Sequence, residues 1–151
     1  TAGSLYDKLA EAGAKLLSES IVKIKEGKAV FVEQQEEKAT FAYTISKEEE
    51  FISFDRDISK VYDHIRGLIP FPVGHGIINN KKVKFHKVRK VEKAIYSKPG
   101  EVLGLLDGGF AIAAVNGYVL IDEIQMEGKA KTDAKAFFNG AGKQLVGQCF
   151  L

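Results

Sequence analysis

The sequence has a single cysteine, Cys149, and no apolar run near the ~20 residues that a membrane-spanning helix needs. One cysteine cannot form a disulfide within the chain, so nothing points to an oxidising compartment. The first residues, Thr1 to Ser4, have neither the basic region nor the apolar stretch of a signal peptide. We therefore expect a cytoplasmic protein that contacts no membrane. Because the chain starts without methionine and enters a helix almost at once, we also expect a fragment, a processed product or an isolated domain.

Catalytic and metal-binding patterns are also missing. His64, His75 and His86 are not accompanied by cysteines or paired carboxylates at metal-ligand spacing. The acidic residues 48–50 fall in a stretch expected to face solvent, so we assign them no chemistry. Neither a phosphate-binding lysine motif nor a dinucleotide glycine fingerprint is present. The sequence predicts no catalytic residue and no metal ligand.

Charge is unevenly distributed along the 151 residues, of which 45% are hydrophobic, enough for one domain with a core. The net charge is only +2, but residues 1–57 carry 8 Lys/Arg against 12 Asp/Glu, whereas residues 58–151 carry 14 against 8. An excess of positive charge in one part of a chain is a weak indication of a polyanionic partner.

Two helices and a linker are predicted before the middle of the chain. Apolar residues recur every three or four positions between Ser4, the expected cap, and Gly27, which predicts an amphipathic helix of about 22 residues. Residues 28–50 are expected to form an extended surface linker with short strand-like pieces. A second helix should start after the cap Asp57, bury Ile58, Val61, Tyr62 and Ile65, and end at Gly67.

Residues 73–124 read as about five short strands joined by tight turns. The expected turns are Asn79-Asn80, Gly108-Gly109 and Asn116-Gly117. Such strands favour a small closed or partly open barrel. A last short helix is expected from the cap Thr132 to Gly140. The predicted fold class is mainly β with flanking helices.

Several motifs resemble the C-terminal part of methionyl-tRNA formyltransferases. In chain order these are residues 3–9 (GSLYDKL), 39–42 (ATFA), 45–49 (ISKEE), 65–73 (IRGLIPFPV), 98–103 (KPGEVL), 108–113 (GGFAIA), 119–125 (VLIDEIQ) and 136–140 (AFFNG). Their order and spacing together carry the resemblance, which covers nearly the whole chain.

The resemblance implies a division of the chain. Residues 1–32 would be the last helix and strand of a formyltransferase catalytic domain, residues 33–50 a linker, and residues 51–151 a small oligonucleotide-binding-like (Greek-key) β-barrel. The family's catalytic residues and its donor, 10-formyltetrahydrofolate, belong to a domain preceding Thr1, so this chain would bind no cofactor itself. Its partners would be initiator tRNA and that N-terminal catalytic domain. Without the catalytic domain, the stripe of Leu5, Leu9, Leu16 and Ile24 should be partly uncovered.

The sequence departs from the family pattern at three places. Phe54 and Phe71 stand where the family usually has tryptophan, and residues 128–132 replace a lysine-arginine-methionine cluster. These departures leave open an alternative: the C-terminal domain of a related formyltransferase acting on amino sugars or folate, which binds no RNA.

A basic run is the feature most indicative of binding. Eight Lys/Arg and one acid occur between Lys81 and Lys98. In a strand, Lys82, Lys84 and His86 would share one face while Val83 and Phe85 point into the core. Such a strand can present cations to a phosphate backbone, or can simply deter edge-to-edge aggregation. The predicted nucleic-acid-binding residues are Lys81, Lys82, Lys84, Lys87, Arg89, Lys90, Lys129 and Lys131.

Overall fold

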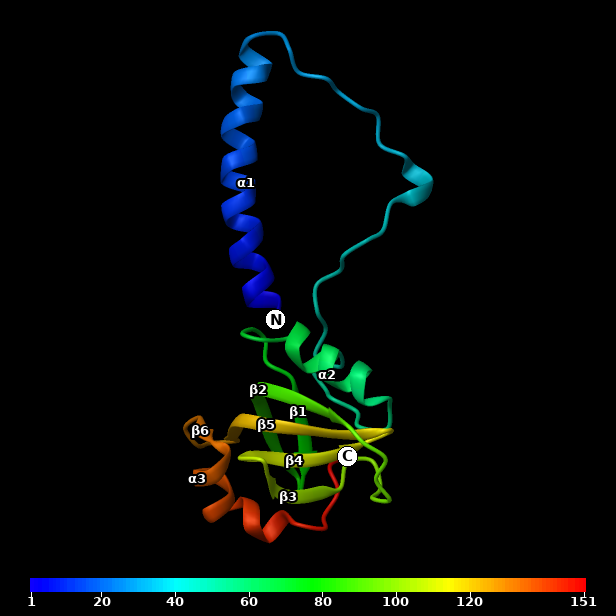
Figure 1. Cartoon of the computed structure of the whole chain (residues 1–151), viewed down its shortest axis with the longest axis vertical. Coiled ribbons are helices and arrows are strands. Elements are labelled where there is room, and N and C mark those ends of the chain that lie inside the picture. Colours follow the sequence, from blue (N-terminus) through cyan, green and yellow to red (C-terminus); the bar gives the residue numbers. More distant parts are fainter. The chain divides into compact units, whose positions relative to one another are not determined.

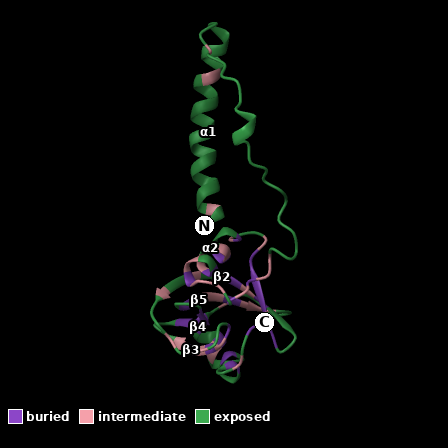
Figure 2. Ribbon diagram, turned by 90° about the vertical axis from the view of Figure 1, so that its right-hand side faces the viewer, coloured by how far each residue is buried: buried purple, intermediate pink, exposed green.

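The computed structural model describes residues 1–151. The chain forms two compact units, residues 3–45 and residues 46–151 together with the first two residues. Figure 2 shows that the purple, buried residues gather in the second unit.

The first unit is a helix followed by an extended segment. Helix α1 (Ala2–Lys25) has no buried residue, and Gly27 ends it with a φ of 71° (Figure 1). Ser4, the expected cap, lies inside the first turn, so the helix begins three residues earlier than predicted. Residues 30–32 are exposed and form no strand, and the only further element is the short 3-10 helix η1 (Glu36–Lys38).

The apolar stripe of α1 is uncovered, as predicted. The exposed fractions are 57% for Leu5, 61% for Leu9, 63% for Leu16 and 56% for Ile24. No helix of the chain is both long and apolar enough to cross a bilayer.

The second unit contains an antiparallel sheet, so the predicted fold class is confirmed. Its strands follow the order β1-β2-β5-β4-β3, and β6 pairs with β5. The strands are β1 (His75–Ile78), β2 (Lys81–Glu92), β3 (Val102–Leu106), β4 (Gly109–Ala114), β5 (Gly117–Met126) and β6 (Thr132–Asp133) (Figure 1).

The hairpin turns lie close to the predicted positions. Asn79 and Asn80 have φ values of 50° and 58°, and Asn116 has a φ of 66°, conformations that asparagine adopts more readily than most residues. The turn between β3 and β4 is Asp107-Gly108 rather than Gly108-Gly109, because Gly109 is already the first residue of β4.

The C-terminal segment, residues 147–151, closes the sheet into a barrel-like form. Gly147 N donates to Val102 O at 2.9 Å, and Phe150 N donates to Gly100 O at 2.9 Å, so the segment pairs beside β3. Leu151 N donates to Ile77 O at 2.9 Å, which connects the same segment to β1. Residues 147–151 therefore satisfy backbone groups at both edges of the sheet.

Glycine makes this closure possible. Gly100 has a φ of 85°, and a Cβ there would lie 2.6 Å from the carbonyl oxygen of Phe150. At Gly76 of β1, a Cβ would lie 2.7 Å from Cδ1 of the Phe150 ring. Only residues without side chains allow the C-terminal segment to approach this closely.

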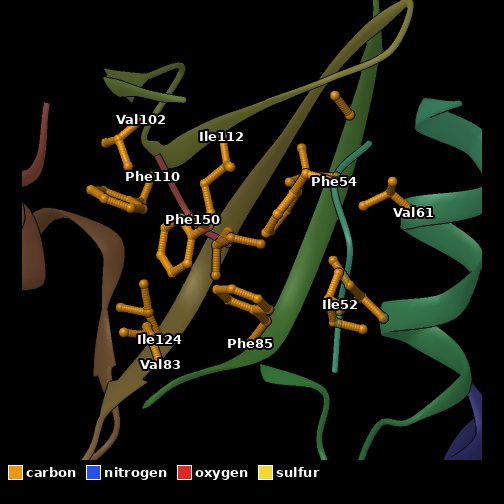
Figure 3. Packing of buried hydrophobic residues seen from close by; sticks show 14 of the residues in the cluster. Ile52, Phe54, Val61, Val83, Phe85, Val102, Phe110, Ile112, Ile124 and Phe150 are labelled. Atoms are coloured by element: carbon orange, nitrogen blue, oxygen red, sulfur yellow. The ribbon is translucent and has the colours of Figure 1, made fainter. Parts of the chain in front are cut away.

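Three phenylalanines from distant parts of the chain meet in the core. The ring centroids of Phe54 and Phe150 are 5.6 Å apart, those of Phe85 and Phe150 5.7 Å, and those of Phe54 and Phe85 5.8 Å (Figure 3). Offset and edge-on aromatic contacts at such distances stabilise beyond the burial of area. The core therefore joins the segment before α2, strand β2 and the closing segment.

Helix α2 (Ile58–Gly67) packs against this core and has the bounds that were predicted. It buries Ile58, Val61 and Ile65, and the Asp57 carboxylate accepts a hydrogen bond from Ser59 N at 2.9 Å. Tyr62, expected on the buried face, is half-buried.

Helix α3 (Ala134–Asn139) and the 3-10 helix η2 (Gly142–Leu145) follow the sheet. The cap of α3 is Asp133, whose carboxylate accepts from Ala136 N at 2.8 Å, so the predicted cap Thr132 was wrong by one residue. Thr132 instead pairs with Ile124 in the sheet, which requires it to be extended.

Candidate nucleic-acid interface

The first half of β2 alternates between core and surface as predicted. Val83 and Phe85 are fully buried, Lys82 is exposed, and Lys84 and His86 are half-buried. The three polar side chains therefore share the outer face of the sheet.

A paired irregularity between β2 and β5 changes this alternation. Phe85 pairs with Ile124 and Val88 pairs with Ile121, and both pairs point inward. Each strand has two residues between these inward positions, where regular alternation allows only one. On β5 the two are Asp122 and Glu123. The consequence is that Lys87 and Arg89 lie on the same outer face as Lys82 and Lys84, whereas strict alternation would turn them inward.

Lys90 consequently points toward α2. Its ammonium donates to Ser59 Oγ at 2.8 Å, lies 5.8 Å from the Tyr62 ring centroid and pairs with Glu92. The hydrogen bond to Glu92 raises the pKa of Lys90. This predicted site residue is therefore separated from the cations of the outer face.

Arg89 is held by protein acceptors. Its Nη2 lies 2.7 Å from Asp122 Oδ1, its Nε lies 3.0 Å from Asp122 Oδ2, and Nη2 also donates to Asp107 O at 3.1 Å. The hydrogen bonds to the Asp122 carboxylate raise the pKa of Arg89, and a two-pronged contact of this kind fixes the guanidinium plane. The edge of the guanidinium formed by Nε and Nη2 is therefore occupied and cannot also hold a phosphate.

Lys131 is also neutralised within the chain. Its ammonium lies 2.7 Å from Glu123 Oε2, and that hydrogen bond lowers the pKa of Glu123. Of the eight predicted cations, five form no ion pair with a carboxylate; these are Lys81, Lys82, Lys84, Lys87 and Lys129. We call these five residues the lysine surface.

A shallow groove accompanies the lysine surface. It has a volume of about 200 Å³ and is lined by Lys82, Lys84, Gln125, Met126, Glu127 and Gly128. The Glu127 carboxylate in this groove accepts a hydrogen bond from the backbone N of Lys82 at 3.2 Å. The acid thus supports the backbone without pairing with a lysine ammonium.

His86 and Gln125 connect β2 to the turn that carries Lys129. His86 Nε2 donates to Gln125 Oε1 at 3.0 Å, and Gln125 Nε2 donates to Lys129 O at 3.0 Å. Both ends of the Gln125 amide are therefore occupied, which fixes the turn relative to β2. Gln125 was not singled out from the sequence, because a lone glutamine on a strand gives no binding signal.

The other two histidines, His64 and His75, lie in surroundings that indicate a structural role. His64 Nε2 donates to Glu49 O at 2.7 Å, and its Nδ1 accepts from Arg56 Nη2 at 2.7 Å. His75 is buried beside Phe51 with its Nδ1 unpaired, and burial, followed by the charge of Lys82, lowers the pKa of His75. No group of three or more His, Cys, Asp or Glu residues could hold a metal ion.

Comparison with known proteins finds formyltransferases among the relatives of this chain. A family model described as a formyl transferase C-terminal domain matches residues 44–142. Methionyl-tRNA formyltransferase of Bacillus cytotoxicus is 39% identical over 146 residues, which are 96% of this chain and 46% of the relative. The enzyme of the same name from Macrococcus caseolyticus is 39% identical over 150 residues, 99% of this chain and 48% of the relative. The chain thus spans about half the length of the curated relatives it matches.

Solved structures share the fold at low identity. A variant of HypX from Aquifex aeolicus matches 95% of this chain and 26% of its own, with a TM-score of 0.70 and 21% identity. HypX in complex with tetrahydrofolic acid matches 87% of this chain and 23% of its own, with a TM-score of 0.64 and 20% identity. At such identities the likeness concerns architecture alone.

Proposed function

Because the chain belongs to the formyl transferase C-terminal domain family, we propose that it holds initiator tRNA for a methionyl-tRNA formyltransferase. The barrel would bind the RNA in the cytoplasm while the methionyl amino group receives a formyl group from 10-formyltetrahydrofolate bound elsewhere in the enzyme. Positioning of this kind contributes to rate because it replaces a bimolecular encounter with a reaction between held groups.

The lysine surface is the observation that carries this proposal. Its five ammonium groups lie on β2 and on the turn after β5, and none forms an ion pair with a carboxylate. Unpaired cations release counterions from nucleic acid on binding, whereas ion-paired ones first have to give up their partner. Contacts of this kind position a phosphate backbone without reading its base sequence.

The exposed stripe of α1 supports the second partner, an N-terminal catalytic domain. Leu9 and Leu16 are 61% and 63% exposed on one helix whose residues are nowhere buried. A contiguous, exposed apolar stripe marks a surface that packs against another domain. In the proposal, residues 1–32 belong to that domain, residues 33–50 link it to the barrel, and the catalytic groups and the formyl donor lie outside this chain.

The chain alone is expected to have no formyltransferase activity. Incubation with methionyl-tRNA and 10-formyltetrahydrofolate should give no formylmethionyl-tRNA above the rate without protein, because this chain supplies only the holding step. A complete methionyl-tRNA formyltransferase is the positive control. Measurable turnover by the chain would contradict this division of labour.

Direct binding of tRNA tests the proposal itself. The chain should shift initiator tRNA in a gel or filter assay at about 50 mM salt and release it as salt is raised, since nonspecific contacts weaken steeply with ionic strength. Failure to bind tRNA even at this salt would overturn the proposal. That outcome would favour the alternative hypothesis, in which the domain belongs to a formyltransferase acting on amino sugars or folate.

Asp122→Asn is expected to strengthen tRNA binding. The change removes the charge that pairs with Arg89 at 2.7 Å and so frees another cation beside Lys82, Lys84 and Lys87 on the outer face. One additional phosphate contact steepens the dependence of log affinity on log salt by about 0.7 to 0.9. Asp133→Ala, which removes an acid that caps α3, is the control for general loss of negative charge. An unchanged slope for Asp122→Asn would show that Arg89 does not reach the RNA.

A further inference from the structure

Tyr96 has the most exposed aromatic side chain of the chain. Its relative accessibility is 108%, whereas Tyr118 on the neighbouring sheet face is 8% exposed. Tyr96 lies in the loop of residues 93–98 that directly follows β2, and the exposed residues Lys93 and Lys98 flank it. The Tyr96 ring contributes no buried contact to the fold.

The loop is nevertheless fixed at both ends. Ile95 packs against an apolar cluster of Ala111, Tyr118 and Leu120 on the sheet. On the other side, Glu101 N donates to Lys98 O at 3.0 Å, and Gly100 N donates to Ala113 O at 2.8 Å. The ring is therefore exposed on an anchored base rather than on a free tail.

This base lies on the same face of the sheet as Lys82, Lys84 and Lys87 of the lysine surface. On β5 the inward residues are Val119, Ile121 and Ile124 of the main core, so Tyr118, Leu120 and Asp122 point outward. Arg89 pairs with Leu120 in the strand ladder, and its side chain binds Asp122. The lysines of β2 lie on the other side of Arg89, toward the start of the strand. One face therefore carries cations at one end, the neutral Arg89–Asp122 pair in the middle and Tyr96 beyond it.

We propose that Tyr96 stacks on an unpaired base of the RNA whose phosphates the lysine surface holds. The inference rests on the proposed function and adds an aromatic contact to its electrostatic one. Proteins that hold single-stranded nucleic acid combine a cationic track with aromatic rings on which bases stack, and every base offers a suitable face. The partner class is thus RNA with an unpaired nucleotide beside a phosphate run.

The effects of stacking and of charge differ in a salt titration. Tyr96→Ala should weaken binding of initiator tRNA by about fivefold to a hundredfold at every salt concentration, with an unchanged slope, because a stacked ring releases no counterion. Tyr96→Phe should bind like the wild type. Tyr43→Ala, at a tyrosine that is 85% exposed in the other unit, should also leave affinity unchanged.

Tyr96→Trp gives a direct readout, because the chain contains no tryptophan. The introduced indole should be quenched by a 12-nucleotide single-stranded RNA and not by a perfectly paired duplex of the same length. The matched variant Tyr43→Trp should show no such difference.

The outcomes separate the two proposals. Unchanged affinity for Tyr96→Ala together with unquenched Tyr96→Trp would overturn the stacking while the salt-dependent binding of tRNA stood. Equal quenching in both tryptophan variants, or equal losses in both alanine variants, would also overturn it by showing nonspecific contact. Absence of RNA binding by the wild-type chain would overturn the proposed function and the stacking with it.

Discussion

Replacing Phe150 by alanine is expected to destabilise the chain by about 3 to 5 kcal/mol, the cost of deleting a buried phenylalanine. Phe150 is 5% exposed and contacts the rings of both Phe54 and Phe85. Loss of this amount is a large part of the stability of an ordinary domain, so the urea midpoint should fall sharply. Circular dichroism during urea titration measures it.

The matched control is Phe31→Ala. Phe31 is 83% exposed, so the same chemical change should alter stability by no more than about 0.5 kcal/mol. Gly100→Ala tests closure without deleting any ring, because its Cβ would meet the Phe150 carbonyl oxygen at 2.6 Å; a loss above about 1 kcal/mol is expected. If Phe150→Ala and Phe31→Ala unfold at the same urea concentration, the C-terminal segment does not close the barrel.

Replacing Lys82, Lys84 and Lys87 by glutamate is expected to lower tRNA affinity about 100- to 500-fold at 0.1 M salt. The estimate assumes one phosphate contact for each lysine and roughly 0.7 to 0.9 counterions released per contact. The fold should persist, because the inward neighbours Val83 and Phe85 are unchanged and fully buried. Filter binding gives the affinity, and circular dichroism checks the fold.

A charge-matched variant controls for the change of six units in net charge. Lys60, Lys135 and Lys143 are exposed, form no ion pair and lie on α2, α3 and η2 rather than on the lysine surface. Their replacement by glutamate should reduce affinity far less, through long-range charge alone. Equal losses in the two variants would show that tRNA responds to total charge and has no defined contact surface.

Local signals in the sequence predicted much of the fold. Asp57 caps α2, and the asparagine turns at 79–80 and 116 connect the strands, because caps and tight turns depend on residues close together in the chain. The cap of α3 was misplaced from Asp133 to Thr132, since both residue types can cap and only the pairing of Thr132 with Ile124 decides between them.

Features that join distant residues could not be predicted in this way. The closing segment at 147–151 bonds to Ile77 and Gly100, and its sequence shows no strand alternation. The irregularity that keeps Lys87 and Arg89 on the outer face requires both β2 and β5. The alternation within one strand's sequence does not show how that strand pairs with its neighbour, so such an irregularity is not predicted.

Eight cations were predicted for the candidate site, and the structure separates five unpaired lysines from three residues that form ion pairs. Arg89 and Asp122 are 33 residues apart, so their pairing is invisible to a count of local charge. Lys131 and Glu123 are eight residues apart, and Lys90 and Glu92 are two residues apart on one strand. Whether the five unpaired lysines bind RNA remains a prediction.

The salt dependence of tRNA binding tests the central claim most directly. Log affinity of the wild-type chain plotted against log salt should have a slope of about −3.5 to −4.5, from five lysine–phosphate contacts. For the Lys82, Lys84 and Lys87 glutamate variant, with two contacts left, the slope should flatten to about −1.4 to −1.8, while circular dichroism shows the same fold. Equal affinities and equal slopes for the two proteins would contradict the account and would make the lysine surface a solubilising edge only.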